Sequence, residues 1–399
     1  MKTSESFKSL NKAFDEFNAK FKEEASKDGV SLESFRKEIN ENLKEWEVEF
    51  NIDINPVRPE DIIKNLVSHS FTDKTLDKEM NIGLYGQGLQ RHLIYTLIRL
   101  SSQYREAKTY NKKEFFPELT LILFEEPEAF LHPAQQEFLN SSLRDLSSED
   151  GQQIIISTHS PTFVSKNIEE ISSLIKLKKE NGITKSFQVS EGIRKSIIEK
   201  NSELTQLFKS KLYDSSVDEN TRDRIRKLLG ETDDEIRMDE ESIRYSLWLD
   251  TERSSSFFAD IVLICEGATE KVFIEYLIKN KWDNLREKKI YVLDAMGKFN
   301  IHRYMNLFKE LGIYHSVLAD GDENRNVHEI LNKFIEDNKN DYTKGIHFFN
   351  NKIEDFLGIP TPPANRRDKR PLNVMWHYKN DRISDSKIDE LEEIIEGII

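Results

Sequence analysis

The sequence contains very little cysteine and no long apolar run. Its single cysteine, Cys265, lies inside an apolar stretch, so a disulfide within the chain and a zinc site built from cysteines are both excluded. Such cysteine usage is typical of a reducing compartment, and we expect a cytoplasmic protein. No apolar run reaches the length of a transmembrane helix, and the first residues lack the apolar core of a signal peptide, so we expect no membrane partner.

Basic residues are also fewer than acidic residues. The chain has 72 acidic and 58 basic residues, which gives a net charge of −14 at pH 7. This balance argues against a protein that coats nucleic acid without specificity. It does not exclude an enzyme whose acids bind metal ions and whose basic residues are grouped locally. With 399 residues, of which 37% are hydrophobic, the chain is long enough for two or three domains with ordinary cores.

Three short apolar runs between Phe257 and Asn326 are each followed by acidic residues. The runs Ile261–Cys265, Ile290–Leu293 and Ser316–Ala319 have the length and composition of buried strands. In an open parallel α/β sheet, ligands bind at the carboxyl ends of the strands. We therefore expect one acidic site at that edge, formed by the residues that follow the three runs: Glu266, Glu270, Asp294, Asp320 and Asp322.

The spacing of these acids predicts that they converge. Glu266 and Glu270 are four residues apart and face the same side if a helix begins at the intervening turn. Asp320 and Asp322 point the same way if the chain stays extended through Gly321. With no lysine or arginine between them, four such carboxylates would repel one another unless cations neutralise them. Sites that offer only oxygen ligands suit Mg²⁺ or Mn²⁺.

Two of these motifs carry a family resemblance. Glu266-Gly267 after the first run and Asp320-Gly321-Asp322 after a later one resemble the Toprim domain, and FFADIVLICEGATEKVF resembles its form in the OLD (overcoming lysogenisation defect) nucleases. The resemblance implies DNA cleavage with two Mg²⁺ or Mn²⁺ ions, held by the four acids already named, with Asp294 and Glu354 as further ligands. Either motif alone could be a solvated acidic loop, but the two in this order favour the Toprim interpretation.

A basic cluster follows the acidic motifs in the sequence. Basic groups beside an acidic metal site would hold the DNA backbone and neutralise the charge that develops on the phosphorus centre. The resembling family places a lysine before a proline here, whereas this chain has Lys369 and then Arg370 before Pro371, so either could take the role. A solubilising surface loop is the alternative for the rest of the cluster. The expected DNA-binding residues are Arg366, Arg367, Lys369 and Arg370.

The first half of the chain resembles part of an ABC-type ATPase, in the version found in SMC-like and OLD proteins. A glycine-containing turn before an apolar helix resembles the signature motif, and two apolar strands, 119–124 and 153–157, resemble the Walker B strand and the strand before the switch histidine. On this resemblance Glu125 would hold the Mg²⁺ of ATP, Glu126 would be the general base, and His159 would sense the γ-phosphate.

The phosphate-binding loop of such an ATPase is missing from the sequence. No G-x-x-x-x-G-K-[ST] motif precedes the signature-like turn, so we expect ATP binding only if a partner supplies that loop. The chain would then start partway through its ATPase domain. The missing first half of the ATPase domain could be a separate chain, or it could have been removed. Alternatively, the half that is present here could persist as a scaffold. The residues expected to face a partner's nucleotide are Gly86, Gln87, Gly88 and Arg91, with Gln87 at a position where serine is common.

These observations predict an α/β protein in which a partial ABC-type ATPase lobe with an N-terminal helical hairpin precedes a C-terminal Toprim domain. We expect a metal-dependent DNA endonuclease of the OLD type, acting in antiphage defence of the Gabija type. It would form a homo-oligomer and have a separate ATPase half or a helicase as partner. The alternative is a non-catalytic structural or sensor subunit. The expected divisions are a hairpin at 1–48, the ATPase part at 49–190, a helical connector at 191–255 and Toprim at 256–399.

Overall fold

The computed structural model divides the chain into two compact units, Met1–Thr96 and Leu97–Ile399. It describes residues 31–43, 49–51, 71–73, 76–86, 120–164, 170–230, 249–322 and 326–399, and isolated residues or pairs and triplets of residues elsewhere before residue 98 and between 240 and 244. No helix in these described parts is both long and apolar enough to cross a bilayer. The second unit contains both acidic motifs.

In the first unit the structure describes one helix and one small hairpin. Helix α2 spans Leu32–Leu43, and strands β1 (Phe71–Asp73) and β2 (Lys78–Met80) pair antiparallel. A 3₁₀ turn, η2, follows at Ile82–Leu84, where the Asn81 side chain accepts a hydrogen bond from the Gly83 amide. This turn lies at the start of the signature-like segment. The other expected features of the first 70 residues lie largely outside the described residues.

The second unit begins with a strand–helix–strand element. Strand β3 (Thr120–Glu125) pairs in parallel with β4 (Gln152–Ser157), and α5 (Pro133–Ser147) connects them. Helix α5 begins at a capping box in which the His132 side chain accepts from the backbone and Gln135 bonds back to it. These strands lie within one residue of those expected from the sequence.

A hairpin and a group of helices connect this element to the C-terminal sheet. After the 3₁₀ turns η3 (Pro161–Phe163) and η4 (Ile171–Ser173), strands β5 and β6 pair antiparallel in register from Ile175–Gln188 to Glu180–Ile183. The remaining elements of this part, in chain order, are β5 (Ile175–Glu180), β6 (Ile183–Gln188), α6 (Glu191–Leu212), α7 (Glu219–Leu229), α9 (Thr251–Ser254) and η5 (Ser255–Phe258).

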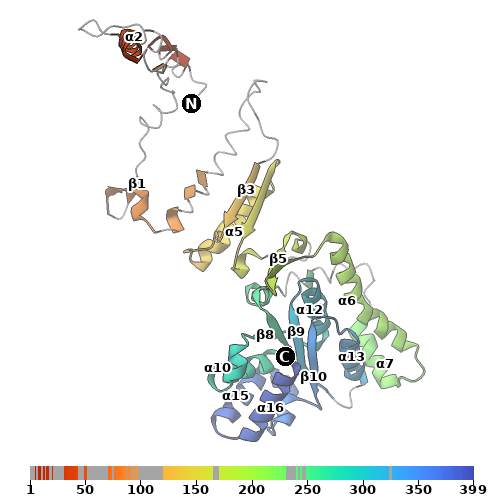
Figure 1. The fold of residues 1–399 in the computed structure, drawn as a ribbon. Coiled ribbons are helices and arrows are strands. Elements are labelled where there is room, and N and C mark those ends of the chain that lie inside the picture. The colour runs from red at the N-terminus through yellow and green to blue at the C-terminus, as the bar shows by residue number, and fades with distance from the viewer. Residues whose placement is uncertain are drawn as a thin grey trace. The chain divides into compact units, whose positions relative to one another are not determined.

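The C-terminal part is a four-stranded sheet in which every neighbouring pair of strands is parallel. Figure 1 shows α12 and α13 on one side of it and α10, α15 and α16 on the other. In spatial order the strands are β10 (Thr343–Phe349), β9 (Tyr314–Asp320), β7 (Ile261–Cys265) and β8 (Tyr291–Asp294). The helical elements are α10 (Ala268–Asn280), α11 (Asp283–Glu287), η6 (Lys298–Asn300), α12 (Ile301–Glu310), α13 (Asn326–Asp337), α14 (Ile353–Phe356), η7 (Ala364–Lys369), α15 (Arg370–Lys379) and α16 (Asp385–Ile398).

Both faces of this sheet are covered, as a parallel sheet requires. In β7, Val262 and Ile264 pack into a core that also contains residues of α6, α12 and α13. The alternate residues Leu263 and Cys265 pack into a second core with residues of α10, α15 and α16. Cys265 is fully buried, and burial raises the pKa of its thiol well above the usual value. The period of two in this strand therefore fixes which side chains face each helical layer.

Candidate active site at the carboxyl edge of the sheet

The order of the strands places a ligand site between β7 and β9. From β7 the chain crosses to β8 on one side and then to β9 on the other, so the direction of winding reverses between β7 and β9. Crevices for ligands form at the carboxyl ends of parallel strands at such a switch point. Glu266 follows β7, and Asp320 ends β9. The acids predicted from the sequence therefore lie where the fold favours ligand binding.

The carboxylates of the two motifs lie close together. The Asp320 amide donates to Oε2 of Glu266 at 3.3 Å, which joins the ends of the two strands directly. Glu270 lies in the first turn of α10 and accepts from the Gly267 amide at 3.1 Å. Burial, then the Asp320 charge, raises the pKa of Glu266 to about 7. Burial and then the charges of Asp320 and Glu266 raise the pKa of Glu270, which is 2% exposed.

Asp320 and Asp322 are both buried, but they are held differently. Asp320 Oδ1 accepts from the Ile353 amide at 2.9 Å, and burial raises the pKa of this carboxyl group. Asp322 has φ of +53°, so the extended conformation expected to continue through this residue is wrong. The Asp322 amide donates to the Asn351 carbonyl at 3.0 Å, which supports the turned backbone. The charge of Asp322 nevertheless acts on Glu266 and contributes to the raised pKa there.

Two basic side chains lie among these acids: Arg370, one of the two residues expected beside the metal site, and Lys298, which was not expected there. Arg370 donates to both oxygens of Glu354 at 2.5 Å and to Asp320 Oδ2 at 3.2 Å. Its hydrogen bonds to Glu354, followed by the charges of Asp320 and Glu354, raise the pKa of the guanidinium despite burial. Lys298 Nζ lies 2.9 Å from Asp322 and 3.9 Å from Glu266. Sequence reasoning missed Lys298, because a lysine that follows a glycine ordinarily predicts an exposed turn.

The other predicted metal ligands have different surroundings. Oδ1 of Asp294 accepts from the Met296 amide at 2.7 Å, and Oδ2 lies 3.9 Å from Arg253. Glu354 is fully buried in the first turn of α14 and makes its bidentate pair with Arg370. The structure therefore brings Glu354 to the acid cluster through Arg370, while the contacts of Asp294 are with α9 and its own loop.

Of the predicted DNA-binding residues, only some contact the acidic site. Arg370 is the first residue of α15 and reaches the acids, whereas Lys369 caps that helix and is exposed. Arg366 is exposed and pairs with Asp368 at 3.2 Å. The side chain of Arg367 lies outside what the structure describes. Of the Lys369 and Arg370 alternatives, Arg370 is the one that contacts the acidic site.

The donor set fits a hard divalent cation. Glu266, Glu270 and Asp320 offer oxygen atoms only, and their raised pKa values show that burial and mutual repulsion oppose their full ionisation. A divalent cation would remove that penalty, and all-oxygen sites suit Mg²⁺ or Mn²⁺. Within the described residues, no three acidic, histidine or cysteine side chains form a ready-made metal cage. The oxygen ligands are therefore of the type that such an ion prefers. Lys298 and Arg370 pair with some of these acids.

The ATPase-like residues form a separate cluster at the ends of β3 and β4. Glu125 ends β3 and is exposed, and Glu126 has φ of +42°. Nε2 of His159 lies 3.4 Å from Glu126 Oε1, so the structure brings these two predicted residues together. Glu128, which sequence reasoning missed, accepts at 2.7 Å from both Thr158 Oγ1 and the His159 amide. Its signal was its place in the Glu-Glu-Pro-Glu run.

The signature-like residues are described only in part. Gly86 is exposed, and a side-chain carbon added there would meet nothing within 4 Å. Gly88 lies in a helical stretch. Gln87 and Arg91 lie outside the described residues, and their expected nucleotide contacts stay predictions.

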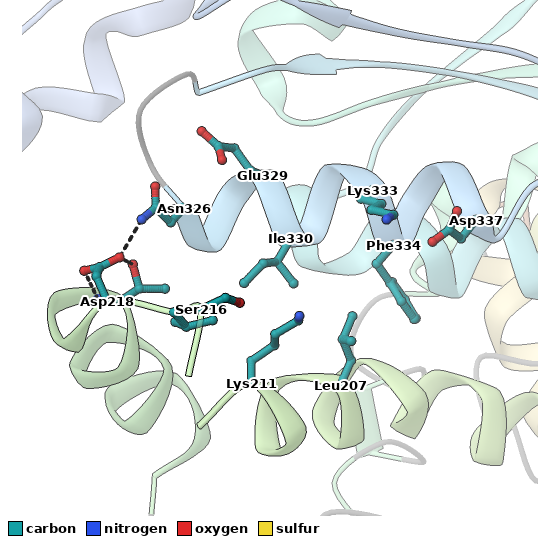
Figure 2. Close-up of a pocket in the computed structure, with 12 residues that line it drawn as sticks. Leu207, Lys211, Ser216, Asp218, Asn326, Glu329, Ile330, Lys333, Phe334 and Asp337 are labelled. Carbon is teal, nitrogen blue, oxygen red and sulfur yellow. Dashed lines mark hydrogen bonds between the residues drawn. The ribbon is translucent and has the colours of Figure 1, made fainter. Parts of the chain in front are cut away.

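A pocket of about 510 Å³ lies between α6, α7 and α13, apart from the acid cluster. Figure 2 shows Leu207 and Lys211 of α6 opposite Ile330 and Phe334 of α13. The Asn326 side chain donates to Asp218 at 2.6 Å and so links α13 to the start of α7.

Helix α13 also contacts the acidic site. His328 Nδ1 lies 3.2 Å from Asp322, and the Asn332 side chain donates to the Gly321 carbonyl at 2.7 Å. One helix therefore lines the pocket and supports the Asp-Gly-Asp turn.

Comparison with known proteins identifies two family models. Residues 257–322 match the model described as overcoming lysogenization defect protein-like, TOPRIM domain, and residues 1–164 match an AAA ATPase domain. The first match ends at Asp322, so it covers Glu266, Glu270 and both aspartates of the later motif.

Curated relatives agree with these models. The chain is 25% identical over 296 residues to the Old nuclease of Escherichia phage P2, which covers 73% of this chain and 43% of that protein. It is 27% identical over 201 residues to the OLD nuclease of Thermus scotoductus, which covers 50% and 30%. It is 23% identical over 307 residues to Endonuclease GajA of Bacillus cereus, which covers 74% and 39%. The chain thus spans less than half the length of each of these relatives.

Proposed function

We propose that this chain is a metal-dependent DNA endonuclease. It carries an OLD-like Toprim domain and AAA ATPase sequence, and it is homologous to OLD nucleases. The observation that supports this most strongly is the meeting of Glu266, Glu270 and Asp320 at the switch point of the sheet. Buried acids that resist ionisation are costly in a purely structural role, and they suit a site that binds cations.

In this proposal the acids from β7, α10 and the end of β9 hold the metal. Glu266, Glu270, Asp320 and Asp322 would be ligands of two Mg²⁺ or Mn²⁺ ions. The chemistry that these ions supply when bound is activation of a water molecule and stabilisation of the leaving oxygen of a phosphodiester. Asp294 and Glu354 remain proposed as additional ligands. The ion pair of Glu354 with Arg370 makes Glu354 a supporting residue in the conformation described here.

Arg370 is the proposed residue for stabilising charge on the scissile phosphate. Its guanidinium lies beside Asp320 and is fixed by Glu354, so its position is set before substrate binds. A planar, permanently charged group of this kind suits phosphate oxygens. Lys369, Arg366 and Arg367 would hold the DNA backbone nearby, and their contacts would carry no base specificity.

The proposed role of the first half of the chain depends on other subunits. Glu125, Glu126 and His159 would serve ATP only where another chain supplies the phosphate loop. We propose a homo-oligomer, together with a separate ATPase half or a helicase-type partner. Antiphage defence stays the proposed role of the assembly, and the similarity to Endonuclease GajA supports its nuclease part.

A plasmid cleavage assay tests the proposed function. The full chain should nick or cut DNA with Mg²⁺ or Mn²⁺ and lose activity in EDTA. Asp320→Asn should lower the rate by roughly 100-fold or more, because it removes one charged ligand from the site. Asp337→Asn, an acid at the far end of α13, is the matched control and should cleave like the parent. Equal cleavage by Asp320→Asn and the parent would contradict the assignment.

A further inference from the structure

Lys298 is a buried cation within the acid cluster. Its side chain is 1% exposed, and Nζ lies 2.9 Å from Asp322 Oδ2 and 3.9 Å from Glu266 Oε2. The backbone just before it is anchored to the same site, because the Gly297 amide donates to the Glu266 carbonyl at 2.7 Å. Gly297 has φ of +112°, a conformation that favours glycine. This turn directs Lys298 inward rather than toward solvent.

The cluster therefore has its own counter-ions. Arg370 pairs with Asp320 and Glu354, while Lys298 pairs with Asp322 and approaches Glu266. A buried ammonium needs such carboxylate partners, since an unpaired charge away from water is very unfavourable. The same two carboxylates, one from each strand end, would have to turn to a divalent ion if that ion bound between them. An ammonium and a divalent ion cannot both occupy the space between these oxygens.

We propose that Lys298 is a resident counter-ion that a divalent metal must displace from Glu266 and Asp322. This inference rests on the proposed metal-dependent function, and it adds a residue that controls metal affinity. In the metal-free protein Lys298 keeps the two acids together and compensates part of their charge. When the metal arrives, the ammonium gives up both carboxylates.

The proposal predicts that removing the ammonium tightens metal binding. Lys298→Met keeps the length and apolar stem of the side chain and removes the ammonium, while His328, whose Nδ1 lies 3.2 Å from Asp322 Oδ2, stays in place. The affinity of the full chain for Mn²⁺, measured by calorimetry and by electron paramagnetic resonance of free Mn²⁺, should increase about tenfold or more. Lys309→Gln, which removes one partly exposed lysine that pairs only weakly with Glu310, is the control for net charge and should leave affinity within about twofold.

The outcomes separate this inference from the proposed function. Unchanged or weaker Mn²⁺ binding by Lys298→Met would overturn the displacement proposal. If Lys298→Met does not fold, Lys298→Gln, which retains a hydrogen-bond donor, should show the same tightening, and its failure to do so would overturn the proposal too. Asp320→Asn should lose Mn²⁺ binding. If it binds like the parent, the metal site itself is wrong, and the displacement proposal falls with it.

Discussion

At the scale of single residues, the acids of the cluster differ in the charge of their neighbours. Glu266 and Glu270 have carboxylates as their main charged neighbours, and burial is the first cause of their raised pKa values. Asp320 and Asp322 each have a basic partner, Arg370 and Lys298 respectively. The pair on β7 and α10 is therefore the part of the site with most to gain from an added cation.

The raised pKa of Glu266 predicts how stability depends on pH. The folded protein holds a proton on this group up to about pH 7, whereas the unfolded chain releases it near 4.5. The stabilising contribution is thus complete below pH 4.5 and is lost as the pH rises through about 7. The melting temperature in EDTA should fall from about pH 4.5 to about pH 7, and saturating Mg²⁺ should reduce the fall. Glu266→Gln should flatten the profile, and an equally steep profile in that variant would contradict the assignment.

Gly321 is required for a steric reason. A side-chain carbon at this position would lie 2.0 Å from the Phe349 carbonyl oxygen and 2.8 Å from that of Asn350. Gly321→Ala should lower the free energy of unfolding by about 1–3 kcal/mol or more, because backbone atoms must move. Chemical denaturation measures this change. Gly192→Ala, where nothing lies within 4 Å in helix α6, should change stability by less than about 1 kcal/mol. Equal effects of the two substitutions would exclude the steric explanation.

At the scale of elements, helix α16 packs against strands β9 and β10 of the sheet. Ile388, Leu391 and Ile395 of α16 are fully buried against the second core. The Ser316 hydroxyl of β9 donates to the Ile398 carbonyl at 2.5 Å. A side-chain carbon on Gly345 of β10 would lie 2.7 Å from Ile398 Cα, so the end of the helix lies against this strand. The position of β9, which ends in Asp320, therefore depends on residues near the end of the chain.

Truncating a buried side chain of α16 should destabilise the four-stranded parallel sheet and the core on this face of it. Leu391→Ala should cost about 2–5 kcal/mol, because it removes buried methyl groups and leaves a cavity. The exposed neighbour Glu393 supplies the control, and Glu393→Ala should stay within about 0.5 kcal/mol of the parent. Urea denaturation followed by circular dichroism measures both changes. A loss below 1 kcal/mol for Leu391→Ala would mean that α16 is not part of the cooperative core.

The elements of the acidic site could be predicted from sequence because local signals determine them. Apolar runs that end in acids indicated β7, β8 and β9, and the structure confirms all three within two residues. The pairing of Arg370 with Glu354 and the burial of Lys298 depend on contacts between distant segments, which periodicity does not encode. A lysine after a glycine ordinarily predicts an exposed turn, and only the packing of the strand ends makes Lys298 buried.

At the scale of the whole molecule, two kinds of domain sequence are joined in one chain. The matches to the OLD-like Toprim model and the AAA ATPase model confirm the resemblance and the α/β class expected from the motifs. The predicted boundaries at residues 48, 190 and 255 stay predictions. The ATPase motifs could be found in the sequence. The pairing of Glu126 with His159 could not, because it depends on strands β3 and β4 lying side by side in the fold.

The isolated chain should not turn over ATP. It has the Glu126 and His159 pair, but its sequence lacks the motif whose backbone amides and lysine hold the phosphates. Phosphate release from ATP by the purified chain should equal the buffer background. The control is a preparation of Glu126→Gln, which should give the same background. Turnover by the parent that disappears in Glu126→Gln would show that the chain binds ATP by another route.

The burial of the only cysteine makes the chain suited to spectroscopic labelling. Cys265 is enclosed in β7, and its thiol resists ionisation, so thiol reagents should spare it in the folded protein. One cysteine introduced on the surface of each compact unit would then carry a probe without further mutagenesis of the native sequence. Distances between such probes, measured with and without DNA, would test whether DNA changes the separation of the two units.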